Sequence, residues 1–284
     1  MMTTNNTEAL LSLRESDEVY TIEASFSESA AVMNAGRAPF DDIRVRQAAT
    51  YAMPQEAYLT LIDGGITTSA DSVFNPDQAY NNPDVVQITD MPDLAAPLIE
   101  SYCQDVPDSC TDGKVNFELQ QIGPSVLKSR ISDLLIDAYE DYFNVTVEEL
   151  LADAFNVQLA LGQYDMAVAS AFGLPEPGLD AVYFLCRFIS LISLNVMQHC
   201  DEERDELIYA IWASTDPDER AEMWKRVQEI NHDSYSVVYL AHEVSTVAAR
   251  NNVHNVCGLT TPFRNEALMC NNWAVAIPLQ AWLS

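Results

Sequence analysis

The stretch from residue 38 to residue 53, APFDDIRVRQAATYAM, carries the sharpest structural signal in the chain. Asp41 and Asp42 follow a proline–phenylalanine pair, and a carboxylate at this place can accept hydrogen bonds from the free amide groups at a helix start. Small apolar residues recur behind them at helical spacing: Val45, Ala48, Ala49 and Ala52. The stretch therefore predicts a capped helix with one buried face.

The segments around this helix predict alternating strands and helices. The segment EVYTIEASFSESAAVMNAG, at residues 18–36, alternates in polarity and carries β-branched and aromatic residues, which predicts one or two strands ending near Asn34. Up to residue 123, the patterns predict a helix from Pro54 to Gly64, a surface excursion over 66–93, a short helix over 94–102 and a strand over 114–123. The middle of the chain follows with a helix over 126–139, a strand over 143–147, a helix over 147–160 and a strand from Tyr164. The last predicted elements are a loop over 172–180, a helix from Asp216 and a strand over 236–241. Such alternation indicates a mixed α/β domain.

Composition narrows the possible partners. The chain has 284 residues, of which 48% are hydrophobic, so it can bury a sizeable core. Its 43 acidic residues outnumber 14 basic ones, and the formal net charge is −29. Because phosphate contacts require clustered Lys and Arg, this balance excludes nucleic acid and disfavours an anionic membrane surface. No apolar stretch approaches the roughly 20 residues that a transmembrane helix needs.

The six cysteines suggest an oxidising compartment. The spacings of Cys103 with Cys110 and of Cys257 with Cys270 can each close a disulfide loop, and neither pair matches the CxxC spacing of a zinc site. Cys186 and Cys200 lie in apolar surroundings and are expected as buried thiols. The N-terminal sequence MMTTNNTEAL has no signal-peptide pattern. We therefore expect that the true beginning of an exported chain precedes this one.

Four segments, taken in order, resemble one family. Residues 38–53 look like the PF-D-x-R-V-R-Q-A helix start of extracytoplasmic solute-binding proteins of the peptide/nickel class, and GQYDMAVASAFG at 162–173 looks like its G-x-Y-D-M strand. Residues 203–230 resemble the paired helices of the family, and SYSVVYLAH at 234–242 takes the place of the strand that follows them. The resemblance covers roughly residues 30–242.

The resemblance implies a periplasmic-binding-protein-like (class II) α/β fold, consisting of the second lobe plus part of the first. Residues 1–31 would end a first-lobe segment before the hinge, residues 32–241 would form the second lobe, and residues 242–284 would return to the first lobe. A family member closes its two lobes on a small solute, an oligopeptide or dipeptide, and delivers it to an ABC permease outside the cytoplasm. Only half of such a protein is expected here, so the chain alone is expected to bind weakly.

The resemblance also marks ligand-binding candidates after Tyr164. The positions that carry a tryptophan and an amine-binding aspartate in the family read Ala171 and Leu174 here. Ser170, Phe172 and Glu176 are therefore the cleft candidates beside Ala171, although Phe172 can equally be a core residue and Glu176 a solvated loop acid. Asn34, near the hinge, can touch ligand or serve as a turn residue.

The chain carries no pattern typical of catalysis or of a cofactor site. The four histidines are scattered, without an HExxH pair, and neither a GxSxG elbow nor a P-loop is present. We expect no catalytic residues, no metal and no cofactor. Two other classes of function remain open: a stand-alone protein-interaction module that reuses the lobe surface, and an acidic hydrolase built on Glu176, Asp180 and a histidine.

Overall fold

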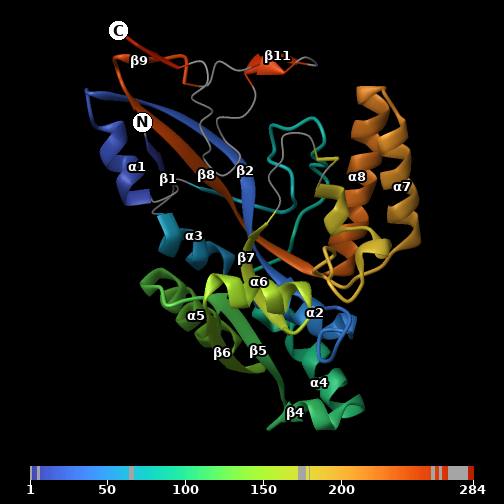
Figure 1. Ribbon diagram of the computed structural model, residues 1–284. Coiled ribbons are helices and arrows are strands. Elements are labelled where there is room, and N and C mark those ends of the chain that lie inside the picture. Colours follow the sequence, from blue (N-terminus) through green and yellow to red (C-terminus); the bar gives the residue numbers. More distant parts are fainter. Residues whose placement is uncertain are drawn as a thin grey trace.

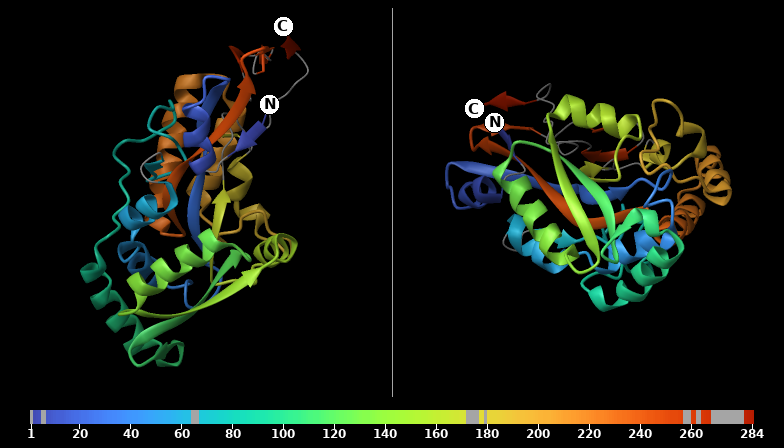
Figure 2. Two further views of the ribbon diagram at one scale, coloured as in Figure 1. Left: turned by 90° about the vertical axis from the view of Figure 1, so that its left-hand side faces the viewer. Right: turned by 90° about the horizontal axis from the view of Figure 1, so that it is seen from below.

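Two long strands run through the whole molecule and organise everything else (Figure 1). In the computed structural model, β2 (Val19–Met33) pairs antiparallel with β8 (Val237–Arg250) along most of both lengths. The structure describes residues 2–4, 7–63, 67–171, 177–178, 180–256, 260–261, 264–267 and 281–284. Figures 1 and 2 show both termini at the same end of this β2–β8 ribbon.

An eight-stranded mixed sheet grows from the ribbon. Its order is β1-β8-β2-β7-β5-β4, with β3 added to β8 and β6 added to β5. The β2–β7 pair is antiparallel, whereas β5 pairs parallel with both β6 and β7. The remaining sheet strands are β1 (Met2–Thr4), β3 (Thr68–Ser69), β4 (Cys110–Thr111), β5 (Lys114–Ile122), β6 (Phe143–Leu150) and β7 (Met166–Ala171).

Helices cover both faces of the sheet. They are α1 (Thr7–Arg14), α2 (Ile43–Tyr51), α3 (Gln55–Asp63), α4 (Ala96–Asp105), α5 (Val126–Tyr139), α6 (Ala152–Ala160), α7 (Glu202–Ala213) and α8 (Pro217–Ser234). Short strands β9 (Val253–His254), β10 (Thr260–Thr261), β11 (Arg264–Ala267) and β12 (Trp282–Leu283) follow the ribbon. The alternation predicted from the sequence is confirmed as an α/β fold. Within the described ranges, no helix has the length and apolar character needed to cross a bilayer.

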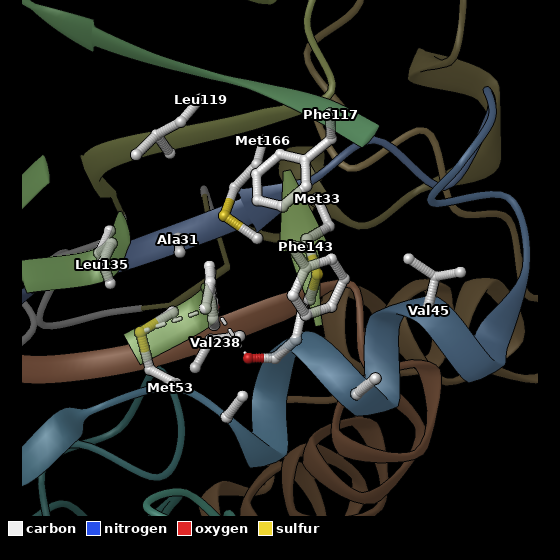
Figure 3. Close-up of a cluster of buried hydrophobic side chains, with 14 of the residues drawn as sticks. Ala31, Met33, Val45, Met53, Phe117, Leu119, Leu135, Phe143, Met166 and Val238 are labelled. Atoms are coloured by element: carbon white, nitrogen blue, oxygen red, sulfur yellow. Dashed lines mark hydrogen bonds between the residues drawn. The ribbon is translucent and has the colours of Figure 1, made fainter. Parts of the chain in front are cut away.

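Alternate residues of β2 enter two different cores. Ala31 and Met33 pack with α2, α4 and α5 in one core, which Figure 3 shows around Phe117 and Phe143. Ala30 and Val32 face the other core, formed with α7 and α8 around the fully buried Trp224. The period of two along a strand thus divides β2 between the two faces of the sheet.

The buried Arg46 connects the start of α2 with the end of α8 through hydrogen bonds. Asp42 caps α2 as expected, since its carboxylate accepts a hydrogen bond from the Arg44 amide at 2.8 Å. Arg46 donates from Nε to the Ser234 carbonyl at 2.8 Å and from Nη1 to the Phe40 carbonyl at 2.7 Å. Ser234 ends α8, so this guanidinium satisfies a free carbonyl at the negative end of that helix.

Three expectations about local structure were wrong. The helix expected from residue 147 begins at Ala152, because β6 continues to Leu150 by pairing with β5. The strand expected at 236–241 extends to Arg250 for the same reason, since β2 supplies a partner throughout. The excursion over 66–93 is not wholly on the surface. It buries Ala70, Phe74, Tyr80 and Val85.

The disulfides also differ in part from expectation. Cys103 and Cys110 are joined, which fixes α4 to β4. Cys186 and Cys200, expected as thiols, are joined as well. The segment between them folds back on itself, because the Asn195 amide donates hydrogen bonds to the carbonyls of Phe184 and His199. The pairing expected for Cys257 and Cys270 lies outside the described residues.

We predict that the Cys186–Cys200 disulfide contributes strongly to stability. It closes a loop with a sequence separation of 14, and the chain-entropy model gives about 3 kcal/mol for a loop of that length. The double variant Cys186→Ala/Cys200→Ala should lose about that much in urea unfolding. Cys103→Ala/Cys110→Ala, which opens a shorter loop with a separation of 7, is the matched control and should lose about 2.5 kcal/mol. An unchanged free energy of unfolding in the first variant would contradict the prediction.

Candidate functional site

Polar residues interrupt the β2–β8 ribbon at its middle. The sequence SFSES at residues 25–29 of β2 pairs with HEVS at residues 242–245 of β8. We call these two segments the polar centre. Apolar side chains are buried on either side of it, in the two main cores toward Met33 and in a small core around Val247. Because buried polar groups are costly without partners, such an interruption marks a place built for something other than stability.

Two irregularities in the strand register enclose the polar centre. One lies between Ser25 and Ser27 and the other between Ser29 and Ala30. Bulges of this kind bend and twist a ribbon and change the direction of side chains. Between them, Ser27 lies opposite Glu243 and Glu28 lies opposite His242.

Glu28 and His242 form a fully buried pair. The Oε1 atom of Glu28 lies 3.1 Å from Nδ1 of His242, and the two side chains are 1% and 2% exposed. Burial raises the pKa of Glu28 well above its usual value, and the nearby carboxylates of Asp180 and Glu243 raise it further. Burial lowers the pKa of His242 to about 4. Both shifts in pKa favour the uncharged forms of the two side chains over an ion pair.

Two polar atoms in the polar centre have no hydrogen-bond partner in the described part of the chain. They are Oε2 of Glu28 and the hydroxyl oxygen of Ser29. Neighbouring residues of a strand point to opposite faces, so the two atoms lie on opposite sides of the ribbon. A buried polar atom without a partner costs about 1–3 kcal/mol. Such atoms are rare in folded proteins, which sets Glu28 and Ser29 apart from the other residues of the ribbon.

The end of β7 lies against the polar centre. In the β2–β7 register, Ser170 is opposite Ser29 and Ala171 is opposite Glu28. Two of the ligand-binding candidates from the sequence thus have their backbone beside the buried pair, although their side chains are outside the described part. Phe172 and Glu176 also lie outside the described residues.

Asn34 serves a structural role at the end of β2. It is 2% exposed. Its Nδ2 donates to the carbonyls of Gly162 and Tyr164 at 3.0 and 3.1 Å, and its Oδ1 accepts from the amide of Gly36 at 3.0 Å. These bonds use the side-chain amide within the chain and fix the start of β7 against the end of β2.

Sequence reasoning missed Glu28 and His242. Glu28 was visible as a charged residue inside a predicted strand, and His242 directly follows another predicted strand. These positions are the one signal that could have selected them. Their pairing could not be seen, because the two residues are 214 positions apart. Nor does the described part of the chain gather three or more His, Cys, Asp or Glu side chains that could hold a metal ion.

A match to a family model identifies the family to which the chain belongs. Residues 2–185 match the family model described as bacterial extracellular solute-binding proteins, family 5, middle region. The chain belongs to this family. Members of family 5 are solute-binding proteins as a class.

Several proteins with named ligands are similar to this family 5 chain. It is 24% identical over 253 residues to di/tripeptide-binding protein 2 of Pseudomonas aeruginosa (strain UCBPP-PA14). This match covers 87% of this chain and 46% of that protein. The periplasmic binding protein DppA from Helicobacter pylori, in complex with the peptide STSA, matches with a TM-score of 0.77 and 17% identity, over 90% of this chain and 49% of that one.

A third match carries a different ligand. NikA from Brucella suis, in complex with Fe(III)-EDTA, has a TM-score of 0.70 and 16% identity, over 90% of this chain and 54% of that one. The family 5 chain therefore spans about half the length of the relatives it matches. The structural matches establish the α/β fold expected from the sequence.

We predict that Glu28 makes the stability of this family 5 chain fall at alkaline pH. Folded Glu28 keeps its proton over a range in which an unfolded Glu, with a pKa near 4.5, has lost it, so stability falls as the pH rises through this range. His242, with its pKa lowered to about 4 from 6.5, acts oppositely, but only below pH 6.5. Glu28→Gln should therefore gain in melting temperature relative to the parent chain as the pH rises from about 6.5 to about 9.

Glu23→Gln is the control for this measurement. Glu23 lies on the same strand, and its ion pair with Arg14 lowers its pKa. The contribution of Glu23 to the free energy of unfolding is therefore constant above the usual pKa of a Glu. The melting temperature of Glu23→Gln, plotted against pH, should run parallel to that of the parent chain above pH 6.5. A Glu28→Gln curve that also runs parallel would show that Glu28 is ionised in the folded chain.

Proposed function

We propose that the protein is the solute-binding component of an ABC importer and that its solute is a short peptide. Membership of family 5 is the observation that carries this proposal. The curated relative reported above is named a di/tripeptide-binding protein, and the Helicobacter pylori neighbour holds a tetrapeptide. The NikA neighbour makes a metal chelate the alternative solute. The partner that receives the solute would be an ABC permease, and the location periplasmic or extracytoplasmic.

The proposed mechanism is hinge closure. We place the second lobe at residues 32–241, with residues 1–31 and 242–284 in the first lobe. The polar centre adjoins both boundaries, which supports a solute site at the crossing between lobes. Contacts available to the solute only in the closed state would shift the population toward closure. Ser170, Ala171, Phe172 and Glu176 would line the cleft, and no bond would be made or broken.

A titration followed by NMR tests this proposal. Defined mixtures of di-, tri- and tetrapeptides would be added to the isotopically labelled chain up to about 5 mM, a range that detects dissociation constants near 1 mM. We expect saturable shifts of backbone resonances in β7 and in the polar centre. Fe(III)-EDTA is the matched comparison. Shifts with the chelate alone would assign the protein to the chelate-binding branch, and no shift with any peptide would overturn the proposal.

A second function, that of a protein-interaction module, is favoured by one surface feature. The loop closed by the Cys186–Cys200 disulfide presents Leu191 and Ile192 to solvent, with 85% and 69% of their area exposed. The loop is anchored internally, since the Ser193 hydroxyl donates to the Asn195 carbonyl at 2.7 Å. An apolar tip on an anchored loop is typical of a contact surface. Strong fluorescence of an apolar dye that is lost in Leu191→Ser/Ile192→Ser, together with no peptide binding, would favour this function.

A further inference from the structure

The exposed side of α7 carries opposite charges at its two ends. Glu202 and Glu206 are exposed in the first half of the helix, and Tyr209 follows on the same face, because residues three and four positions apart are neighbours on a helix. Arg187 lies beside the second half, since its Cζ atom is 5.5 Å from the ring centres of both Tyr209 and Trp212. Within the described ranges, no ion pair uses Arg187, Glu202 or Glu206.

Aromatic rings hold Arg187 in place. In addition to the two rings on α7, the ring centre of Phe188 lies 4.8 Å from its Cζ atom, and each such contact attracts the cation to the face of the ring. The indole Nε1 of Trp212 donates to the Gly178 carbonyl at 2.8 Å, which fixes the largest of the three rings. Arg187 is nevertheless exposed, so its N–H groups are accessible to an acceptor. A guanidinium fixed in this way loses little side-chain freedom when it binds a carboxylate.

Apolar surface adjoins this arginine. Tyr209 and Trp212 are 41% and 40% exposed, and Trp, Tyr and Arg are the residues that most often dominate the binding energy of protein interfaces. The disulfide loop with the exposed apolar tip is fixed to the same helix, because the Cys186 amide donates to the Asp205 carboxylate at 3.0 Å. The loop and the exposed side of α7 therefore form one contact surface with an aromatic centre.

Charge favours a second copy of the chain as the partner of this contact surface. At a net charge of −29, two copies repel each other over most of their surfaces. Residues 181–200 contain a single charged residue, the base Arg187, so two copies approach each other at the lowest cost through the loop. The contact surface also complements itself. When two α7 helices lie antiparallel, the basic end of one lies beside the acidic end of the other.

We propose that this contact surface is the interface of a dimer in which two copies of the chain are related by a twofold axis. In such an interface each contact occurs twice, so Arg187 of each copy pairs with Glu206 of the other, and the aromatic side chains of both copies meet at the centre. Figure 1 shows α7 at the edge of the molecule, beyond α8, where a second copy has access. The inference rests on the contact surface offered above as a second function and names its partner, and it is independent of solute binding.

Sedimentation of the full chain tests for the dimer and for its dependence on salt. We expect a monomer–dimer equilibrium at concentrations up to about 500 μM, a range that detects dissociation constants near 100 μM. The dimer should tighten as the NaCl concentration rises from about 0.1 M to about 1 M, because the screening length falls from about 10 Å to about 3 Å. Added salt thus removes the repulsion between two acidic chains while the apolar contacts persist.

Exchanging the charges tests which face is used. Arg187→Glu and Glu206→Arg each place like charges opposite each other twice, so each variant alone should dimerise about tenfold more weakly or worse. An equimolar mixture of the two variants should dimerise like the parent chain, because every contact again joins an acid and a base. Asp137→Arg is the matched control. It makes the same change of charge at an exposed residue of α5, which Figure 1 shows on the other side of the molecule, and should not weaken the dimer.

The outcomes separate the inference from the proposed functions. A parent chain that stays monomeric at about 500 μM in about 1 M NaCl would overturn the inference, and so would single variants that dimerise normally or a mixture that does not regain the dimer. If the parent chain is monomeric while Leu191→Ser/Ile192→Ser still abolishes dye fluorescence, the contact surface stands with a different partner and the inference alone is wrong. Recovery in the mixture also shows that neither variant is misfolded. The peptide titration decides solute binding separately.

Discussion

The antiparallel pairing of β2 with β8 is the constraint on which the rest of the structure depends. The pairing runs from Val19 opposite Arg250 to Val32 opposite Val237. It joins the two ends of the described chain before any other strand can be placed, because β7, β1 and β3 all attach to this ribbon. Bringing together segments more than 200 positions apart costs loop-closure entropy, and only continuous burial on both faces can offset that cost.

Burial of this kind fails at one place, the polar centre. On one side, β2 contributes alternately to two large cores, and on the other side a small core contains Val247 and Ala249. Between them the strands remain hydrogen-bonded while all residues except Phe26 and Val244 are Ser, Glu or His. The backbone thus remains continuous where the hydrophobic contacts are interrupted.

The sequence predicted what depends on neighbouring residues and missed what depends on distant ones. The start of α2 was predictable because the Asp42 cap and the apolar face lie within one short segment. The start of α6 was not, because the extension of β6 to Leu150 is decided by its pairing with β5. The Cys186–Cys200 disulfide was missed because a fold-back stabilised by Asn195 brings the two residues together. For the candidate site, the resemblance indicated the end of β7, whose backbone lies beside the polar centre. The register that sets Glu28 against His242 has no local signal.

The polar residues at the centre of the ribbon lower the stability of the fold, and this cost bears on their role. A valine at position 28 and an apolar residue at position 242 would remove a buried carboxyl group with an unused oxygen. Replacement of a buried polar pair by packed apolar residues is often neutral or stabilising. The two flanking bulges show that the ribbon also gives up regular pairing at this point. A local cost that the fold could easily avoid is the kind of departure from consistent packing that is expected at functional sites. The polar centre is therefore the part of the ribbon where the sequence departs most clearly from what stability alone would favour.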